Sequence, residues 1–192
     1  MTNMVFVGDC EKVDLMLATA LLLQAHQGES SAAVISDVQR HYRYFQEEVS
    51  GIAIRADQDA VGSEQYVLYD WHSLALPEIK MDKLFAVTTY DRSSLDMAGE
   101  IIRKHQVDGL IVLESDCAIS PKYIRSLLPV KRWYSYYDYP WRRINWVFDG
   151  RVGLRRIEKD FAQTIGDLVQ DVADISENEL KKLWMYAKKR GA

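Results

Sequence analysis

Residues 5–28 read VFVGDCEKVDLMLATALLLQAHQG. The stretch begins with apolar residues, passes through Gly8 and a short polar turn, and continues as a long apolar segment with one early lysine, Lys12. A buried strand, a glycine and then a helix are the layout of a phosphate-binding loop. The stretch therefore predicts a strand at Met4 to Val7 and a helix at Lys12 to His26.

Short apolar runs of the same kind recur along the chain, each followed by a helical or mixed stretch. Continuous apolar runs are typical of strands buried on both faces, as in a parallel sheet covered by helices. The alternation predicts an α/β fold with a doubly wound, mainly parallel sheet and helices on both faces. The predicted strands are Met4 to Val7, Ala33 to Ile35, Tyr66 to Tyr69, Leu84 to Thr88, and Leu110 to Leu113.

Helical spacing and capping signals predict the remaining elements. Gly28 is a stop for the first helix, Ser93 or Ser94 is a candidate cap for the second, and Ser176 stands three residues before Glu179 in capping-box register. The predicted later helices are Ser94 to His105, one beginning near Pro121, Arg155 to Val172, and Glu177 to Lys189.

The composition predicts one domain spanning residues 1–192, with C-terminal helices at about 155–190. The 192 residues are 48% hydrophobic, enough for one substantial core, and the net charge of −4 is mild. The longest apolar run, Leu15 to Leu23, is short of the ~20 residues of a membrane span, and we expect a cytoplasmic protein. The two cysteines, Cys10 and Cys117, have no zinc-site spacing and are expected to be free thiols.

Carboxylates follow several predicted strands. Asp37, Asp70 and Glu114 each stand at the end of an apolar run. Ligands of open parallel sheets bind at the carboxyl ends of the strands, so these acids either hold magnesium through their oxygens or are solvated residues that close buried strands. The four histidines are scattered, with no HxxH spacing, and predict no metal site.

The order and spacing of these motifs resemble the MinD/ParA family of deviant P-loop ATPases over roughly residues 4–172. AAVISDVQRHY (32–42) is similar to the strand that ends in the family's Asp-x-Asp-Pro-Gln motif, reduced here to Asp37 and Gln39. EQYVLYDWHS (64–73) is similar to its Walker B strand. If a nucleotide binds, the resemblance implies a site formed by Gly8, Lys12, Asp37, Asp70 and Glu114.

The loop departs from this family pattern in ways that predict lost ATP chemistry. Gly8 is the single glycine, the signature lysine near the loop start is absent, and Val13 stands where the magnesium-binding hydroxyl belongs. The family's adenine-reading Asn is replaced by Glu114. Acids in the loop and the helix start repel a triphosphate, by several kcal/mol for like charges ~4 Å apart near a surface. These acids are Asp9, Glu11 and Asp14.

Residues 130–148, VKRWYSYYDYPWRRINWVF, combine eight aromatic and four basic residues. Trp, Tyr and Arg dominate binding hot spots, and the same mixture stacks on single-stranded bases. The alternative is that the rings cover one end of the sheet. We expect one or more of Tyr134, Tyr136, Tyr137 and Trp141 to fill the former nucleotide pocket. The predicted partner-binding residues, with Arg142 and Arg143 at the rim, are Arg132, Tyr136, Tyr137, Trp141, Arg142 and Arg143.

The sequence therefore predicts a pseudo-ATPase with a degenerate Walker A loop that acts as an accessory or regulatory protein-interaction subunit. No catalytic residue, metal or cofactor is expected, and a homodimer is expected from the way relatives of this fold pair. One alternative is an atypical ATPase that binds ATP and magnesium through a rearranged loop. A second alternative is a nucleic-acid-contacting module that uses Lys131, Arg132, Arg142 and Arg143.

Overall fold

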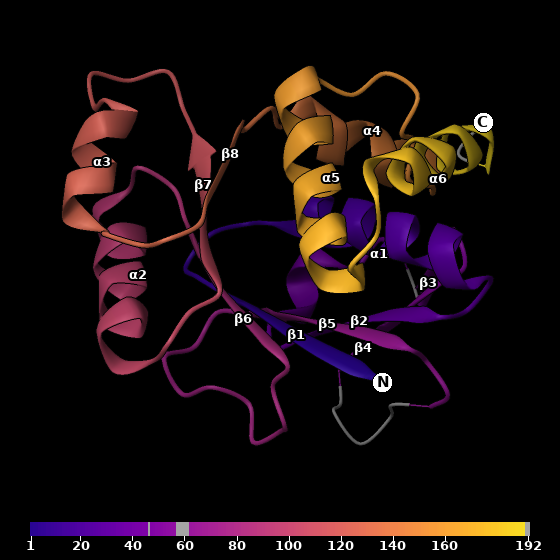
Figure 1. Ribbon diagram of the computed structural model, residues 1–192, viewed down its shortest axis with the longest axis horizontal. Helices are drawn as coiled ribbons and strands as arrows, with labels where there is room; N and C mark the ends of the chain where they lie inside the picture. Colours follow the sequence, from indigo (N-terminus) through magenta and orange to yellow (C-terminus); the bar gives the residue numbers. More distant parts are fainter. Residues whose placement is uncertain (46, 57–61, 191–192) are drawn as a thin grey trace.

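The computed structural model describes residues 1–45, 47–56 and 62–190. These residues contain an 8-stranded sheet with the order β3-β4-β2-β5-β1-β6-β7-β8 (Figure 1). All neighbouring pairs are parallel except the antiparallel pair β3 and β4. The strands are β1 (Thr2–Val7), β2 (Ala32–Ser36), β3 (Glu48–Val49), β4 (Ile52–Arg55), β5 (Tyr66–Trp71), β6 (Lys83–Thr88), β7 (Gly109–Glu114) and β8 (Trp133–Tyr137).

The doubly wound α/β fold and the five predicted strands are confirmed. They form the adjacent positions β2-β5-β1-β6-β7, where each strand has a parallel neighbour on both sides and is buried almost throughout. Strands β3, β4 and β8 were not predicted. The strand β8 lies at the edge and alternates between buried and partly buried residues, and β4 alternates in the same way, so neither reads as a continuous apolar run.

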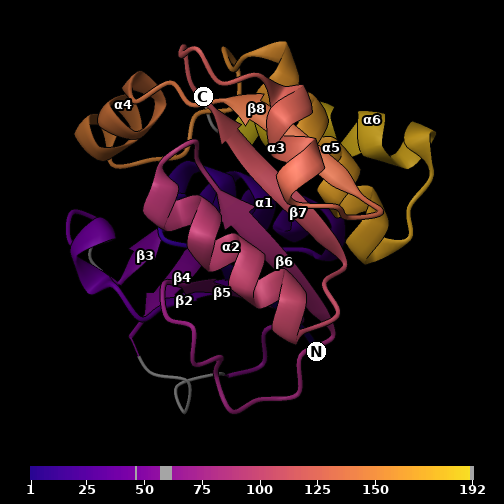
Figure 2. The ribbon, with the colours of Figure 1, turned by 90° about the vertical axis from the view of Figure 1, so that its left-hand side faces the viewer.

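Helices cover both faces of the sheet. In Figure 1, α2 and α3 lie on one side and the other α-helices on the opposite side; Figure 2 views the α2 and α3 layer from outside. Each layer encloses its own hydrophobic cluster against the sheet. Among the described residues, no helix is both long and apolar enough to span a membrane. The helices are α1 (Val13–Gln27), α2 (Arg92–Lys104), α3 (Pro121–Leu127), α4 (Trp141–Asp149), α5 (Lys159–Ala173) and α6 (Glu177–Arg190), with the 3-10 helix η1 (Gln39–His41).

Most predicted helix ends are correct within two residues, but the starts of two helices are wrong: α5 begins at Lys159 and not at Arg155, and the cap predicted for α2 is misplaced. Gly28 ends α1 with φ of 106°, and Ser176 and Glu179 form the reciprocal bonds of a capping box before α6. The helix α2 is not capped by Ser93 or Ser94, because it already begins at Arg92. Ser94 is buried, and its hydroxyl accepts the backbone N–H of Thr89 at 3.1 Å.

The single loop glycine is required by packing against β6. A Cβ atom at Gly8 would lie 1.9 Å from the carbonyl oxygen of Val87. Strand β1 therefore enters the loop in close contact with the neighbouring backbone. This steric reason for Gly8 is independent of any bound phosphate.

We predict that Gly8→Ala lowers the free energy of unfolding by about 1–3 kcal/mol or more, because backbone must move to admit the methyl group. Gly153→Ala is the matched control, since its Cβ atom would meet its nearest neighbour, Trp146 Nε1, at an ordinary 3.7 Å. Denaturant titration measures both. Equal stability of the two variants would contradict the close approach of β1 and β6.

Candidate functional site at the carboxyl edge of the sheet

Three central strands bring the predicted loop and two of the predicted acids to one edge. Asp70 lies on β5, beside Phe6 of β1 and Ser36 of β2 in the parallel registers. Gly8 and Asp37 follow β1 and β2 directly. Because the strands run in the same direction, residues at their carboxyl ends meet at the same edge. The sheet thus places Gly8, Asp37 and Asp70 around the start of α1.

Lys12 is the central cation of this edge, and it points inward. Its ammonium nitrogen lies 2.7 Å from Asp70 Oδ1, and both side chains are 0% exposed. The same nitrogen donates to the carbonyl oxygen of Gly8 at 3.0 Å and contacts those of Trp71 and Cys10 at 3.3 and 3.4 Å. The ammonium is therefore surrounded by oxygen acceptors of its own chain, and none of its surface reaches solvent.

The second carboxylate oxygen of Asp70 also accepts a hydrogen bond. The hydroxyl of Tyr42 donates to Asp70 Oδ2 at 2.7 Å, and Tyr42 is itself buried. Burial raises the pKa of Tyr42 well above its ordinary value, and the nearby Asp70 raises it further. The hydroxyl therefore keeps its proton and serves as a donor. Tyr42 lies on the connection between η1 and β3, and no sequence motif singled it out.

His72 joins the remaining acid to this pair. Its Nδ1 lies 3.0 Å from Asp37 Oδ1, and its Nε2 lies 3.2 Å from the Lys12 ammonium and 3.6 Å from Asp70 Oδ1. The pKa of Asp37 lies below its ordinary value: burial alone raises it, but the hydrogen bonds from the ring and the backbone N–H of His72 lower it. Asp37, His72, Lys12 and Asp70 thus form one continuous polar network.

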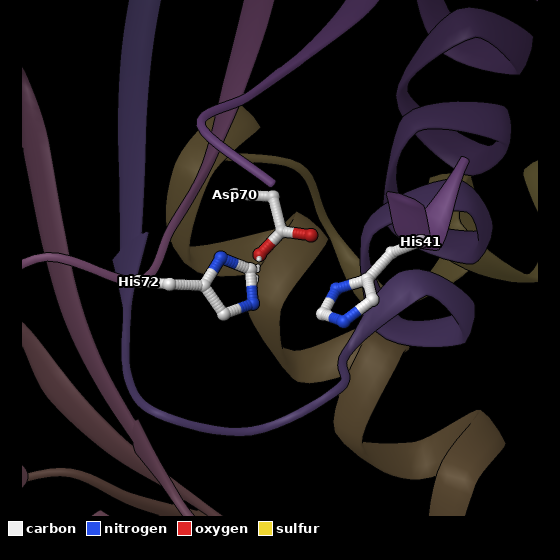
Figure 3. A group of neighbouring side chains, drawn as sticks. All are labelled: His41, Asp70 and His72. Carbon is white, nitrogen blue, oxygen red and sulfur yellow. Dashed lines mark ion pairs between the residues drawn. The ribbon is translucent and has the colours of Figure 1, made fainter. Parts of the chain in front are cut away.

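Two of the four histidines, His41 and His72, lie side by side in space. The rings of His41 and His72 approach edge to face with centroids 5.0 Å apart, although 31 positions separate them in the chain. His41, at the end of η1, lies beside Asp70 and His72 at the end of β5, as Figure 3 shows. Burial lowers the pKa of His41, and His72 lowers it further. The sequence signal for His72 was its position two residues after Asp70, where strand alternation directs two side chains to the same face.

The predicted site residue Glu114 does not join this group. It ends β7, whereas Asp70 lies on β5, and β1 and β6 separate the two strands. At ~4.8 Å between neighbouring strands, three strand positions correspond to ~14 Å. The electrostatic neighbours of Glu114 are instead Tyr90 and Tyr137.

A second buried cation, Arg142, lies on the other side of the start of α1. Its Nε is 3.0 Å from Asp14 Oδ2, and its Nη1 is 2.6 Å from Glu158 Oε2. The guanidinium also stacks on the ring of Phe161, 4.0 Å from the centroid. Asp14 is buried in this ion pair, and it lies 3.6 Å from Arg143 as well. Its charge is therefore compensated inside the protein and does not face the loop, contrary to our expectation.

In the segment 130–148, the prediction of which side chains are buried and which are exposed is wrong for Trp141 and Arg142. Arg142, expected at the rim, is 0% exposed, whereas Trp141, expected in the pocket, is 42% exposed. Both lie on α4, which the sequence analysis did not predict. Positions four apart share a helix face, so burying Trp146 also turns Arg142 inward and directs Trp141 outward.

The other residues of the predicted partner surface also include both buried and exposed side chains. Tyr136 is buried and packs edge to face on Phe161, so it is not accessible to a partner. Arg143 is bound to Asp138 at 2.7 Å and is only 12% exposed in its side chain. Tyr137 is partly exposed, and Arg132 is half exposed and lies 2.6 Å from Asp171.

An apolar groove lies beside the site, between α4 and the residues that follow η1. We call it the α4 groove; it has a volume of about 780 Å³. Ile144 and Phe148 form one wall and are 64% and 90% exposed, while Tyr44 on the opposite wall is 59% exposed. The lining residues are Glu11, Arg40, His41, Arg43, Tyr44, Pro140, Arg143, Ile144, Val147 and Phe148.

Comparison with known proteins identifies the fold. The chain matches no protein-family profile and no curated protein sequence. Its structure is similar to a chain of the MinC:MinD cell division protein complex of Aquifex aeolicus, with a TM-score of 0.62 and 13% identity. The match covers 92% of this chain and 97% of that chain. A ParA family ATPase from Chlorobium tepidum TLS has a TM-score of 0.49 at 11% identity, covering 97% and 98% of the two chains.

The strand order and the similarity to the solved chain show that this is an α/β protein with a P-loop NTPase-like fold. Within that class the chain has the MinD/ParA-like fold, as its motif order predicted. At 13% identity the similarity concerns the fold alone.

We predict that Arg142→Met lowers the free energy of unfolding by about 3–5 kcal/mol, because it leaves Asp14 buried without its partner. Trp141→Ala is expected to cost about 1 kcal/mol, as for a half-exposed side chain. Guanidinium titration of both variants measures the difference. The reverse order of stabilities would show that the assignment of Arg142 to the interior is wrong.

The two thiols are predicted to differ in reactivity. Burial raises the pKa of the Cys10 thiol to about 12, although the Lys12 charge opposes it, whereas Cys117 is exposed. Only the thiolate reacts, and at pH 8 a thiol of pKa 12 is ionised to about one part in 10⁴. A chromogenic disulfide reagent should label one thiol per folded chain rapidly, and Cys117→Ser should remove that phase. Equally fast labelling of both thiols would contradict the burial of Cys10 in the loop.

Proposed function

We propose that this protein is a non-catalytic pseudo-ATPase with the MinD/ParA-like fold, which acts as an accessory or regulatory protein-interaction subunit. One observation carries the proposal: the only lysine of the loop is fully buried in an ion pair with Asp70. A phosphate-binding loop needs that charge directed toward the ligand. Here Lys12 instead neutralises an acid of its own chain.

The other residues of the loop also fit a nucleotide poorly. Phosphate binding needs backbone N–H groups that the ligand can approach closely, and it needs a hydroxyl for magnesium. Gly8 is packed against the Val87 carbonyl, and Val13 supplies no hydroxyl. To bind a triphosphate, the loop would have to release Lys12 from Asp70 and leave a buried carboxylate without its partner, which is costly.

The exposed side of α4 supports a role in protein contacts. Trp141, Ile144 and Phe148 are exposed large apolar residues on one short helix, and Tyr44 faces Ile144 and Phe148 across the α4 groove. Contiguous exposed apolar surface with a polar rim is typical of protein interaction sites. The similar solved chain comes from a complex of two proteins, MinC and MinD. By analogy, we propose that this chain also binds a protein partner.

The contacts of the basic segment weigh against nucleic-acid binding. Phosphate recognition needs lysines and arginines that are free to exchange their counterions for the backbone of the nucleic acid. Three of the four basic side chains are already bound to carboxylates: Arg142 to Asp14, Arg143 to Asp138, and Arg132 to Asp171. We therefore favour a protein partner at this end of the molecule.

Nucleotide binding is tested by thermal denaturation with and without Mg-ATP. A ligand that binds only the folded state raises the melting temperature, so we predict no shift at millimolar Mg-ATP. Lys12→Met and the exposed-lysine control Lys122→Met are measured in parallel for ATP hydrolysis. A shift in the wild-type protein, with turnover that Lys12→Met abolishes while circular dichroism shows this variant folded and Lys122→Met retains activity, would establish the atypical ATPase instead.

The partner surface is tested with a double variant, Ile144→Ser with Phe148→Ser. Both residues are highly exposed, so we predict unchanged stability and loss of the specific partner recovered with the wild-type chain. Leu127→Ser, which changes an exposed aliphatic residue on α3, is the matched control.

Light scattering determines whether that partner is a second copy. A dimer across the α4 groove predicts about twice the mass of one chain, 22.2 kDa, for the wild-type protein and a single-chain mass for the double variant. The assignment of the α4 groove fails if Leu127→Ser loses the partner and the double variant retains it.

A further inference from the structure

Three side chains with metal-ligating atoms meet beside Lys12. They are His41 after β2, Asp70 on β5 and His72 just beyond β5, and their ligand atoms all lie within 4.8 Å of one another. Figure 3 shows the two imidazole rings on either side of the Asp70 carboxylate. Asp70 is fully buried, and both histidines are partly buried.

Two of these side chains are oriented by outer hydrogen bonds. His72 Nδ1 is bound to Asp37 Oδ1 at 3.0 Å, and Nε2 faces Asp70 at 3.6 Å while it also contacts the Cys10 carbonyl oxygen at 3.1 Å. Metal-ligating histidines almost always have their second nitrogen bound to a carboxylate or carbonyl in this way, and ligating carboxylates are hydrogen-bonded in turn. The hydroxyl of Tyr42 donates to Asp70 Oδ2 at 2.7 Å. Asp70 Oδ1 is the inward-facing oxygen, and it is the one that the Lys12 ammonium contacts.

The third side chain has an inward nitrogen without a partner. Among the described residues, His41 Nδ1 is buried and has no hydrogen-bond partner. Figure 3 shows one nitrogen of the His41 ring on the side that faces Asp70 and His72. Buried polar atoms are almost always satisfied, so an orphaned nitrogen directed at two other ligand atoms needs an explanation.

A bound metal ion supplies that explanation, and one ligand–ligand distance is already close to the value it requires. Zinc lies 2.0–2.2 Å from nitrogen and carboxylate oxygen ligands in a tetrahedron, so two of its ligands lie ~3.4 Å apart. His72 Nε2 and Asp70 Oδ1 are 3.6 Å apart. His41 has to approach further, and it is a partly exposed residue at the end of the three-residue η1.

We propose that His41, Asp70 and His72 bind one divalent transition-metal ion of the zinc class, with a fourth position open to water. Two imidazoles and one carboxylate select such ions over magnesium and calcium, which prefer all-oxygen ligands. This inference does not rest on the pseudo-ATPase proposal. The ion would fix the residues around His41, which also form part of the α4 groove.

Lys12 competes for the same position. Its ammonium lies 2.7 Å from Asp70 Oδ1 and 3.2 Å from His72 Nε2, so the ion and the ammonium share two partners and repel each other. Binding therefore requires the ammonium to shift toward the carbonyl oxygens of Gly8 and Cys10, which it already contacts. Removing this charge should strengthen metal binding.

The test is a zinc titration of the chelator-stripped protein in competition with a chromophoric chelator. The Cys117→Ser background removes the exposed thiol. We expect one ion per chain, and no comparable binding of magnesium. His41→Ala and His72→Ala should each weaken the affinity about tenfold or more, because each removes a ligand. Lys12→Met should strengthen it, and cobalt should give the intense visible absorption of a four-coordinate site.

The control is His105→Ala, which removes a histidine at the end of α2, outside the cluster. This variant should bind zinc with unchanged affinity and stoichiometry. Circular dichroism of metal-free His41→Ala verifies that loss of binding is not loss of folding. The proposal is overturned if the folded wild-type chain binds no stoichiometric zinc, or if His105→Ala weakens binding as much as His41→Ala does.

Discussion

The buried ion pair between Lys12 and Asp70 is the constraint on which the carboxyl edge of the sheet depends. It connects the start of α1 to the end of β5, and the lysine also binds the carbonyl oxygen of Gly8 at the end of β1. A cation at a helix N-terminus is opposed by the helix dipole, and a buried carboxylate is costly alone. Each charge is therefore tolerated because the other is present, and the loop between them is closed.

Arg142 repeats this arrangement on the opposite side of the same helix end. Lys12 and Asp14 are two residues apart, and each has a fully buried partner of opposite charge, Asp70 in one case and Arg142 in the other. The first pair fixes the helix to the sheet, and the second fixes it to α4, with Glu158 just before α5 as a further partner. The phosphate-loop position is thus a junction of several elements. This internal use of charge is the physical basis for the proposed loss of ATP chemistry.

The sequence predicted the elements that are apolar throughout, and it failed where burial alternates or is supplied by ions. The five central strands and helix α1 follow from continuous apolar runs, whereas β8 and α4 lie in the aromatic and basic segment, whose composition obscured their periods. Arg142 was assigned to a partner surface because clustered Trp, Tyr and Arg dominate binding hot spots. Its burial depends on Asp14, 128 positions away, and no local pattern reveals that pairing.

The candidate site was predictable in part. The rule that ligand sites lie at the carboxyl ends of parallel strands placed Gly8, Asp37 and Asp70 at one edge correctly. The convergence of His41 and His72 depends on how the residues after β2 return toward β5, which one sequence does not specify. Glu114 was placed in the site by its position at a strand end, but the order of the strands separates it from Asp70.

A double-mutant cycle on Lys12 and Asp70 measures the central interaction most directly. The free energies of unfolding of Lys12→Met, Asp70→Asn and the double variant are obtained by denaturant titration. If the lysine is an internal cation, each single change costs about 3–5 kcal/mol, because it leaves one buried group without its partner. The double variant then loses at least ~1 kcal/mol less than the sum of the single losses. Additive losses, or a silent Lys12→Met, would show that Lys12 is free of Asp70 and available to a ligand.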